Sequence, residues 1–162
     1  MEQRELVLST LDRMGISYSI VEHPPAVTNE DADRFIEGRE GVRTKTLFLC
    51  NRKNTSFYLL IMDQEKRLDI KKLEELVSEK KIHFCNSEQL MEKMGLEPGV
   101  VSLFGLLNNN EKDINVLVDR EVLDERLITF HPNENTSTVF ISTEDMLKFI
   151  DAVGYECRLQ DL

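Results

Sequence analysis

The sequence predicts an α+β fold in which helices flank a mixed, mostly antiparallel sheet or a partly closed barrel. Two apolar runs, Thr44–Asn51 and Ser56–Asp63, have the composition of strands, and the four residues between them suit a hairpin connection. Other strand-like runs also come in hairpin-like pairs, with helix-like segments at the ends and sides. This mixture of elements is typical of the α+β class.

Periodic apolar positions and capping residues predict the helices. Glu5–Met14 carries an apolar stripe that ends at Gly15, and Thr28 can cap a short helix that closes before Gly38 or Gly41. The remaining helices are expected over Leu68–Lys80, Ser87–Met94 and Thr143–Ile150.

Alternating apolar residues predict further strands. Tyr18–His23 ends where it does because Pro24 and Pro25 cannot donate a hydrogen bond to a sheet. Arg120–Leu123 is expected to form a turn or a single helical turn. The other strands are expected over His83–Cys85, Ile114–Asp119, Leu127–His131 and Thr138–Ser142.

Length and composition predict one soluble domain over residues 1–162. The chain has 162 residues, of which 41% are apolar and 31% charged, so it can build one substantial core but not two. No apolar run approaches the roughly 18 residues that a membrane-spanning helix needs, and no signal-peptide pattern precedes the first helix. We therefore expect a cytoplasmic protein that does not bind membranes.

Charge and cysteine content exclude several classes of function. Thirty acidic and twenty basic residues give a net charge of −10, which argues against extensive binding of phosphate backbones and leaves only a local patch for nucleic acid. Cys50, Cys85 and Cys157 show no C-x-x-C pair and no histidine at metal-ligand spacing. We expect them to be reduced, with two of them buried, and we expect neither a metal nor a cofactor.

The segment Gly95–Gly105 is punctuated by glycine and predicts the wall of a small pocket. Pro98-Gly99 is a turn dipeptide, and residues without side chains let backbone amides approach a ligand closely. No charged residue occurs from Gly99 to Asn110. The same residues also suit a buried turn followed by a short core helix or strand, so both interpretations stay open.

Lys45 occupies an unusual place at the start of a predicted strand. With a period of two, its side chain shares a face with Leu47 and Leu49, which are expected to point inward. The ammonium group therefore either contributes to a functional site or reaches solvent from the edge of the sheet.

Five segments, which follow one another over almost the whole chain, resemble a known family. The segments are His23–Thr28 with Glu30, Thr44–Leu49, Glu97–Asn108, Phe130–Thr138 and Ile141–Ile150. The chain resembles the YbaK/prolyl-tRNA synthetase-associated editing domain family and, within it, the freestanding ProX/PrdX type. The resemblance implies a single aminoacyl-tRNA editing (deacylase) domain over residues 1–162. It also implies a trans-editing hydrolase that deacylates mischarged tRNA(Pro), above all alanyl-tRNA(Pro).

The resemblance implies a set of site residues. The functional lysine of the family falls on Lys45, and its glycine-rich pocket loop falls on Gly99–Leu103, where Leu103 replaces the usual proline. The implied catalytic residues are Lys45, Gly99 and Ser102, and the implied substrate-binding residues are Val100, Val101, Leu103, His131 and Asn135.

The expected chemistry needs no strong nucleophile, because the ester of an aminoacyl-tRNA is already activated. The sequence contains no G-x-S-x-G or H-E-x-x-H motif, in agreement with a positioned water as the attacking group. Backbone groups of Gly99–Ser102 can then line the site, and Lys45 can contact the terminal phosphate or ribose.

Three alternatives remain open at the level of sequence. The first is a cysteinyl-tRNA(Pro) deacylase of the YbaK type, and the second is a non-catalytic module that binds aminoacyl-tRNA. The third is a protein-interaction domain with an acidic surface. The expected partners are the acceptor end of mischarged tRNA(Pro) and, as a second candidate, prolyl-tRNA synthetase.

Overall fold

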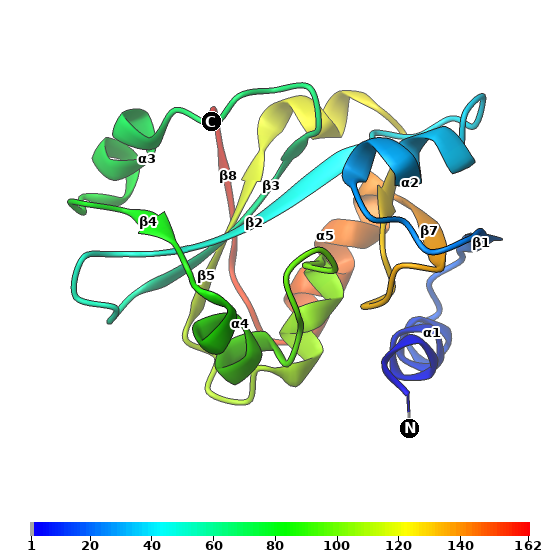
Figure 1. The fold of residues 1–162 in the computed structure, drawn as a ribbon, viewed down its shortest axis with the longest axis horizontal. Coiled ribbons are helices and arrows are strands. Elements are labelled where there is room, and N and C mark those ends of the chain that lie inside the picture. The colour runs from blue at the N-terminus through cyan, green and yellow to red at the C-terminus, as the bar shows by residue number, and fades with distance from the viewer. Residues whose placement is uncertain (1) are drawn as a thin grey trace.

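The computed structural model describes residues 2–162 and has an α+β architecture (Figure 1). The helices are α1 (Gln3–Arg13), α2 (Asn29–Phe35), α3 (Ile70–Val77), α4 (Ser87–Met94) and α5 (Thr143–Ala152), with two 3₁₀ helices, η1 (Leu103–Asn108) and η2 (Arg120–Asp124). The strands are β1 (Ser19–Glu22), β2 (Thr44–Cys50), β3 (Phe57–Asp63), β4 (His83–Phe84), β5 (Ile114–Asp119), β6 (Leu127–Phe130), β7 (Ser137–Ser142) and β8 (Cys157–Gln160). The predicted fold class is confirmed.

The strands form two open sheets. One has the order β1-β7-β6 and is antiparallel, and the other has the order β4-β2-β3-β5-β8. In the larger sheet β2 and β3 form the predicted hairpin, with Thr46 opposite Ile61, while β5 pairs in parallel with β3 and β8. A bridge between Val42 and Ile128 links the sheets, which do not close into a barrel.

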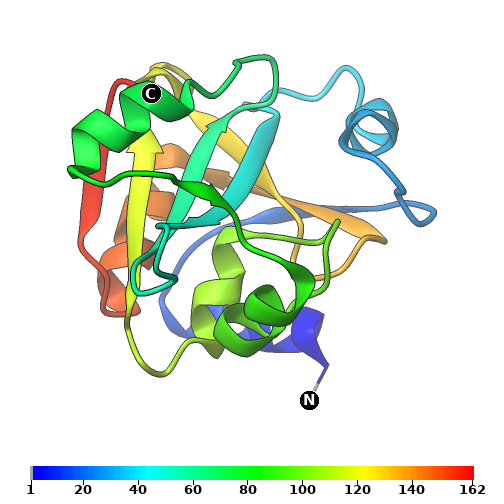
Figure 2. The ribbon, with the colours of Figure 1, turned by 60° about the vertical axis from the view of Figure 1, so that its left-hand side comes forward.

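Strand β3 lies at the centre of the molecule because both of its faces are apolar. Leu59 and Ile61 belong to the main core, which α1, α5 and η1 cover, whereas Leu60 and Met62 belong to a second cluster beneath α3. Helices α3 and α5 therefore cover opposite faces of the larger sheet (Figure 2). Burial on both faces explains why this strand is a continuous apolar run.

The segment Gly95–Gly105 combines the two interpretations that its sequence left open. Gly99 has φ +94°, a conformation that other residues rarely adopt, and lies at the protein surface. A Cβ on Gly105 would stand 2.5 Å from Cε of Met94 and 2.8 Å from Cδ1 of Leu96, so a larger residue there would displace these side chains. The first half of the segment is an exposed turn, and the second half begins a buried 3₁₀ helix.

Strand β8 is the main element that the sequence prediction missed. Its residues are Cys-Arg-Leu-Gln, all of them half-buried, with only a weak alternation of apolar and polar side chains. Its parallel pairing with β5, from Val116 opposite Cys157 to Asp119 opposite Gln160, places it at the sheet edge. Local composition carries little information about such a pairing, because tertiary contacts supply its stability.

Candidate functional site

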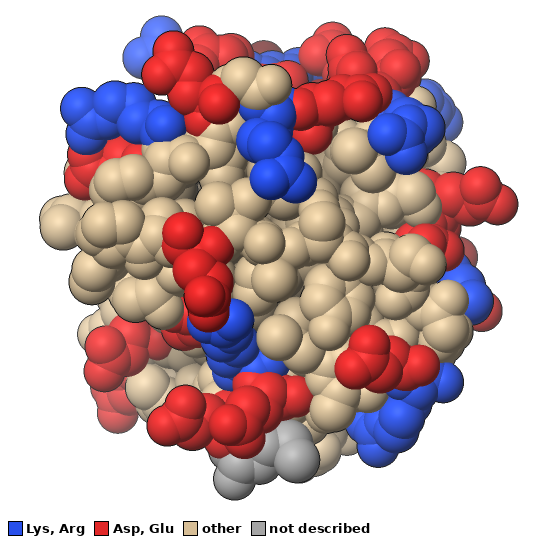
Figure 3. All heavy atoms as spheres, turned by 90° about the vertical axis from the view of Figure 1, so that its right-hand side faces the viewer, with Lys and Arg blue, Asp and Glu red and all other residues tan. Residues whose placement is uncertain are grey.

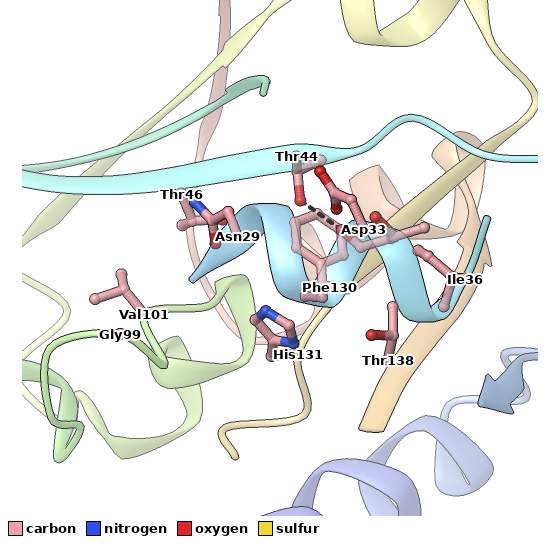
Figure 4. Close-up of a pocket in the computed structure, with 12 residues that line it drawn as sticks. Asn29, Asp33, Ile36, Thr44, Thr46, Gly99, Val101, Phe130, His131 and Thr138 are labelled. Carbon is pink, nitrogen blue, oxygen red and sulfur yellow. Dashed lines mark hydrogen bonds between the residues drawn. The ribbon is translucent and has the colours of Figure 1, made fainter. Parts of the chain in front are cut away.

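A cavity of about 160 Å³ lies between helix α2, the start of β2, the β6–β7 region and the loop around Gly99 (Figure 4). It is lined by Asn29, Ala32, Asp33, Ile36, Thr44, Thr46, Gly99, Val101, Thr129, Phe130, His131 and Thr138. The lining mixes hydroxyl, amide, imidazole and carboxylate groups with a few apolar side chains. Such a mixture can orient a small polar ligand.

Hydrogen bonds fix the threonine side chains on one side of the cavity. Thr44 Oγ1 donates to the Thr129 carbonyl oxygen at 2.5 Å (dashed line in Figure 4), and Thr129 Oγ1 donates to the Val42 carbonyl oxygen at 2.8 Å. Both hydroxyl protons are therefore used in hydrogen bonds within the protein. The free lone pairs of Thr44 Oγ1 remain as acceptors.

A hydrogen bond determines which ring nitrogen of His131 has the free lone pair. Its Nδ1 lies 3.3 Å from the carbonyl oxygen of Ser137, and because a carbonyl can only accept, Nδ1 must carry the proton. Nε2 is then the unprotonated nitrogen. Burial lowers the pKa of His131 below its ordinary value of 6.5, against the opposing effect of the Ser137 hydrogen bond. The ring is therefore neutral at pH 7 and can accept a proton.

His23 and Thr138 form a second polar pair beside the cavity. His23 Nδ1 donates to the Pro24 carbonyl oxygen at 2.8 Å, so Nε2 accepts from Thr138 Oγ1 at 3.0 Å. This commits the Thr138 hydroxyl proton and leaves its oxygen as an acceptor toward the cavity. The His23 ring also stacks on Phe35 at a centroid distance of 5.0 Å, which ties the end of α2 to this pair.

Asp33 is the one carboxylate among the described residues that line the cavity. Burial raises its pKa, and Arg43 acts in the opposite direction. The Arg43 guanidinium is itself held by the carbonyl oxygens of Ile36, Arg39 and Gly41 at 2.7–2.9 Å, so it anchors the end of α2. A half-buried carboxylate in this position attracts a ligand cation.

A larger groove of about 590 Å³ adjoins the cavity and shares Gly99 with it. Its lining includes Gln3 at the start of α1, Val27, Met91 of α4, and the 133–135 turn. Asn135 holds two parts of this lining together, because its Nδ2 donates to the Ala26 carbonyl oxygen at 3.3 Å and its own carbonyl oxygen accepts from Ala26 N at 2.9 Å.

The structure divides the residues suggested by the sequence between these two spaces and the core. Gly99, Val101 and His131 line the cavity, while Val100 and Asn135 line the groove, which Gly99 also borders.

Two of the suggested residues lie in the interior instead. Ser102 is 1% exposed and accepts a hydrogen bond from Phe104 N at 3.1 Å, which caps η1. Leu103 is fully buried in the main core. Neither residue is among those that line the cavity or the groove.

Lys45 lies on the face of β2 opposite to the cavity. Thr44 and Thr46 line the cavity, whereas Leu47 packs against the second cluster and Met62, the strand partner of Lys45, belongs to it. As expected, Lys45 therefore shares its face of β2 with inward-facing leucines. This is the face that α3 covers.

Sequence reasoning missed several residues that line the cavity, chiefly Asn29, Asp33, Thr44, Thr46 and Thr138. One signal was available: the alternation of β2 places Thr44 and Thr46 on one face, between Lys45 and Leu47 on the other. No comparable signal identifies Asp33, since an acidic residue in an exposed helix is ordinary.

The cysteines supply no nucleophile to the cavity. Cys50 is buried, with Sγ 3.3 Å from His83 Nε2, a contact that sequence spacing did not reveal because it forms across β2 and β4. Cys85 and Cys157 are only half-buried, so the expectation of two buried cysteines was wrong. Burial raises the pKa of both thiols, that of Cys157 to about 11, and keeps them protonated. Residues 2–162 hold no cluster of three or more His, Cys, Asp or Glu side chains suited to a metal ion.

Comparison with known proteins identifies the family. The model of a family described as the aminoacyl-tRNA editing domain matches residues 23–149. The chain belongs to this family. The match covers α2, β2, the Gly99 loop and the β6–β7 region, and therefore all the elements that line the cavity.

Named relatives of this editing-domain chain cover nearly its whole length. It is 30% identical over 154 residues to the prolyl-tRNA editing protein ProX of Acetoanaerobium sticklandii, an alignment that covers 95% of this chain and 94% of ProX. It is 25% identical to the mouse prolyl-tRNA synthetase associated domain-containing protein 1, with 96% and 94% of the two chains covered.

Solved structures share the fold of this editing domain. A crystal structure described as a proposed trans-editing enzyme for prolyl tRNA synthetase superposes with a TM-score of 0.76 at 19% identity, covering 97% of this chain and 95% of the other. Within residues 2–162, no helix has the length and apolar character required to span a membrane.

Proposed function

We propose that the chain is a single-domain hydrolase that removes the amino acid from mischarged tRNA(Pro), with alanyl-tRNA(Pro) as the main substrate. The observation that carries this proposal is the small polar cavity with the neutral imidazole of His131 at its wall. Membership of the editing-domain family and the likeness to ProX support it. A volume of about 160 Å³ suits a small aminoacyl group.

His131 is the proposed general base. Nε2 takes a proton from a water molecule whose oxygen bonds to the ester carbonyl carbon, and the carbonyl oxygen becomes negatively charged. When this intermediate collapses, the bond to the ribose oxygen breaks and the imidazolium returns the proton to that oxygen. The products are the free amino acid and tRNA with its terminal hydroxyl restored.

The Gly99 loop is the proposed site of oxyanion stabilisation. Among residues 2–162, no group accepts a hydrogen bond from the backbone N–H of Gly99 or Val101, and both residues line the cavity. The lack of a side chain on Gly99 lets the ester approach this backbone closely. Fixed N–H donors of this kind stabilise a developing oxyanion without reorganisation.

Asp33 is the proposed anchor for the α-ammonium group of the aminoacyl ester. It lines the same cavity as His131, and it is the one carboxylate among the described lining residues. The acceptor oxygens of Thr44 and Thr138 can receive the remaining ammonium protons, because their own protons are committed elsewhere. This arrangement selects an aminoacyl ester over an uncharged acyl ester.

In the proposal, the other residues that the sequence suggested contribute from outside the cavity. Lys45 contributes positive charge to binding of the tRNA acceptor end, which an acidic protein must bind through few phosphates. Ser102 and Leu103 support the Gly99 loop through the cap of η1 and the core. Prolyl-tRNA synthetase as a partner and the cytoplasm as the location belong to the same proposal.

A panel of esters on the same tRNA(Pro) tests the proposed function. The alanyl ester should be hydrolysed fastest and the prolyl ester very slowly, since a ring that clashes with the cavity loses alignment for attack. The seryl and cysteinyl esters differ by one small group, so their kcat/KM should lie within about 10- to 200-fold of the alanyl value. Equal rates on alanyl and prolyl esters would contradict editing, and binding without hydrolysis would favour a non-catalytic module.

A further inference from the structure

Two of the three cysteines lie next to each other where β2 pairs with β4. Cys50 ends β2 and is opposite His83 of β4, and Cys85 follows β4 directly. Because side chains alternate along a strand, Cys50, His83 and Cys85 point to the same face of this strand pair. The Cys85 thiol hydrogen-bonds to Cys50. The two sulfur atoms are therefore neighbours across the sheet.

A histidine can accept the proton of the buried thiol. His83 Nδ1 lies 3.1 Å from the Lys81 carbonyl oxygen, so Nδ1 carries the ring proton and Nε2 is free to accept. Nε2 lies 3.3 Å from Cys50 Sγ, whose proton has Asn54 Oδ1 at 3.2 Å as a second acceptor. Of these two acceptors, only the imidazole is basic enough to take the proton from sulfur. A hydrogen-bonded chain therefore leads from Cys85 through Cys50 to an exposed histidine.

The two thiols differ in their access to solvent. Cys50 is fully buried, whereas Cys85 is half-buried and lines an apolar pocket of about 200 Å³. Burial raises the pKa of the Cys85 thiol, so this thiol reacts only as its proton is removed, and the chain to His83 offers a route for that proton. Cys85 is therefore the thiol that meets an oxidant first, and Cys50 is the thiol that can react with it next.

The pocket beside Cys85 adjoins the candidate site. Three residues line both this pocket and the cavity, namely Thr46, Gly99 and Val101. Helix α4 begins two residues after Cys85, and its Leu90 lines the pocket too. Gln89 of the same helix donates to Cys50 Sγ at 3.8 Å. A movement of Cys85 therefore reaches both α4 and the wall of the cavity.

A bond between the two sulfur atoms requires β4 to move. Cys85 lies two residues beyond the partner of Cys50, and the Cα atoms of such diagonal neighbours are about 7 to 8 Å apart. A disulfide needs a Cα separation of about 4.4 to 6.8 Å. Strand β4 has only two residues and lies at the sheet edge, so it can approach β2. Helix α4 then moves with it.

We propose that hydrogen peroxide converts Cys50 and Cys85 to a disulfide, and that this bond displaces α4 and the Gly99 loop and so lowers activity. The Cys85 sulfur attacks one peroxide oxygen and the O–O bond breaks, which gives a sulfenic acid and water. The Cys50 sulfur then attacks the Cys85 sulfur and displaces the hydroxyl group, which leaves as a second water with the Cys50 proton. In total, two thiols lose two protons and two electrons, and one peroxide is reduced to two waters.

An internal disulfide adds no atoms that could block the site. Strand β4 lies on the opposite side of the molecule from β1 and β7 (Figure 1), whose face shows an uncharged central area with charged residues around its rim (Figure 3). The bond leaves that face uncovered, so a loss of activity reports displacement of the Gly99 loop. The disulfide and the displacement do not depend on the proposed function, whereas the loss of hydrolysis rests on it.

Oxidation of the full chain by hydrogen peroxide tests the disulfide directly. The intact mass should fall by two hydrogen atoms, and trypsin without reductant should release residues 46–52 joined to residues 82–93. Cys50→Ala and Cys85→Ser should not give this product. Cys157→Ser is the matched control, because it removes a half-buried thiol at the opposite edge of the same sheet, and it should form the product at the wild-type rate. A cross-link through Cys157, or sulfinic acid at Cys85 without a cross-link, overturns the proposal.

A substitution of His83 tests the route of the proton. His83→Gln keeps a polar side chain but cannot take up a proton, so the disulfide should form at least about tenfold more slowly at the same peroxide concentration. The rate is measured from the intact mass in samples quenched with a thiol-blocking reagent. An unchanged rate overturns the role of His83.

Hydrogen exchange and deacylation measure the consequence for the site. In oxidised wild type, the backbone amides of residues 95–101 should exchange about tenfold faster than in the reduced protein. The value of kcat/KM for alanyl-tRNA(Pro) should fall about 10- to 100-fold and return after treatment with dithiothreitol. Peroxide-treated Cys85→Ser should show neither change, which controls for oxidation of methionine.

The two readouts separate this inference from the proposed function. Unchanged exchange in the fully cross-linked protein overturns the displacement of the loop. If the reduced protein does not hydrolyse alanyl-tRNA(Pro), the proposed function fails, and the cross-link and the exchange rates still decide this inference. Normal hydrolysis by the fully cross-linked protein overturns the effect on activity and leaves the proposed function intact.

Discussion

The two faces of strand β2 differ in chemistry although their residues alternate in sequence. Thr44 and Thr46 face the cavity, whereas Lys45 and Leu47 face the second apolar cluster. The first face meets polar groups from α2 and from the end of β6, and the second meets the aliphatic side chains of β3 and α3. A residue that marks the strand in sequence therefore need not lie on the face that borders the candidate site.

The largest expected effect belongs to His131 on the cavity side. His131→Ala should lower kcat for alanyl-tRNA(Pro) by about 100-fold or more, because it removes the proposed general base. KM should change little. His131→Gln, which keeps a polar group of similar size but has no basic nitrogen, should be nearly as slow, and recovery of activity in that variant would contradict the assigned role.

The pH profile of kcat/KM tests the same residue without mutation. Only the neutral imidazole accepts a proton, so activity should fall as pH decreases through the pKa of His131. Because burial lowers that pKa, the acidic limb should have its midpoint below pH 6.5, the ordinary value for histidine. A midpoint above this value would show that the ring is not buried as described.

The second-largest effect on activity is expected for a substitution of Asp33. Asp33→Asn removes the proposed anchor for the α-ammonium group and should lower kcat/KM by about 10- to 100-fold, mainly through KM. The matched control is Glu30→Gln, which removes a charge from the exposed side of the same helix and should leave both constants unchanged. An equal loss in the two variants would mean that the net charge of α2, rather than the position of Asp33, matters.

Features that depend on neighbouring residues could be predicted from the sequence, whereas features built from distant residues mostly could not. The β2–β3 hairpin and the helix caps at Thr28, Asn86 and Ser142 depend on neighbouring residues, and the structure contains them. The cavity combines residues up to about a hundred positions apart, among which the sequence singled out only Gly99, Val101 and His131 as site residues. Asp33 has no local signature, since its place in the cavity wall depends on how α2 packs on the rest of the chain.

A substitution at Lys45 tests the face of β2 that points away from the cavity. Lys45→Met should raise KM for alanyl-tRNA(Pro) by about threefold to tenfold with little change in kcat, since the proposed role of its charge is in tRNA binding and the residue does not border the cavity. Thr46→Val, on the other face, should lower kcat instead. A loss of kcat in Lys45→Met at saturating tRNA would mean that the lysine reaches the reacting ester.

The smallest effect on selectivity is expected at Leu103, although its sequence position suggested that it shapes the amino-acid pocket. Its side chain is fully buried in the main core and does not line the cavity. Leu103→Ala should therefore lower the free energy of unfolding by about 2 to 5 kcal/mol and leave the ratio of alanyl to prolyl hydrolysis unchanged. Val101→Ala, at a residue that does line the cavity, should instead reduce that ratio by about tenfold as the cavity enlarges. Chemical denaturation and kcat/KM on both esters separate the two variants. A change of selectivity in Leu103→Ala at unchanged stability would place Leu103 at the substrate and shift the proposed boundary of the site into η1.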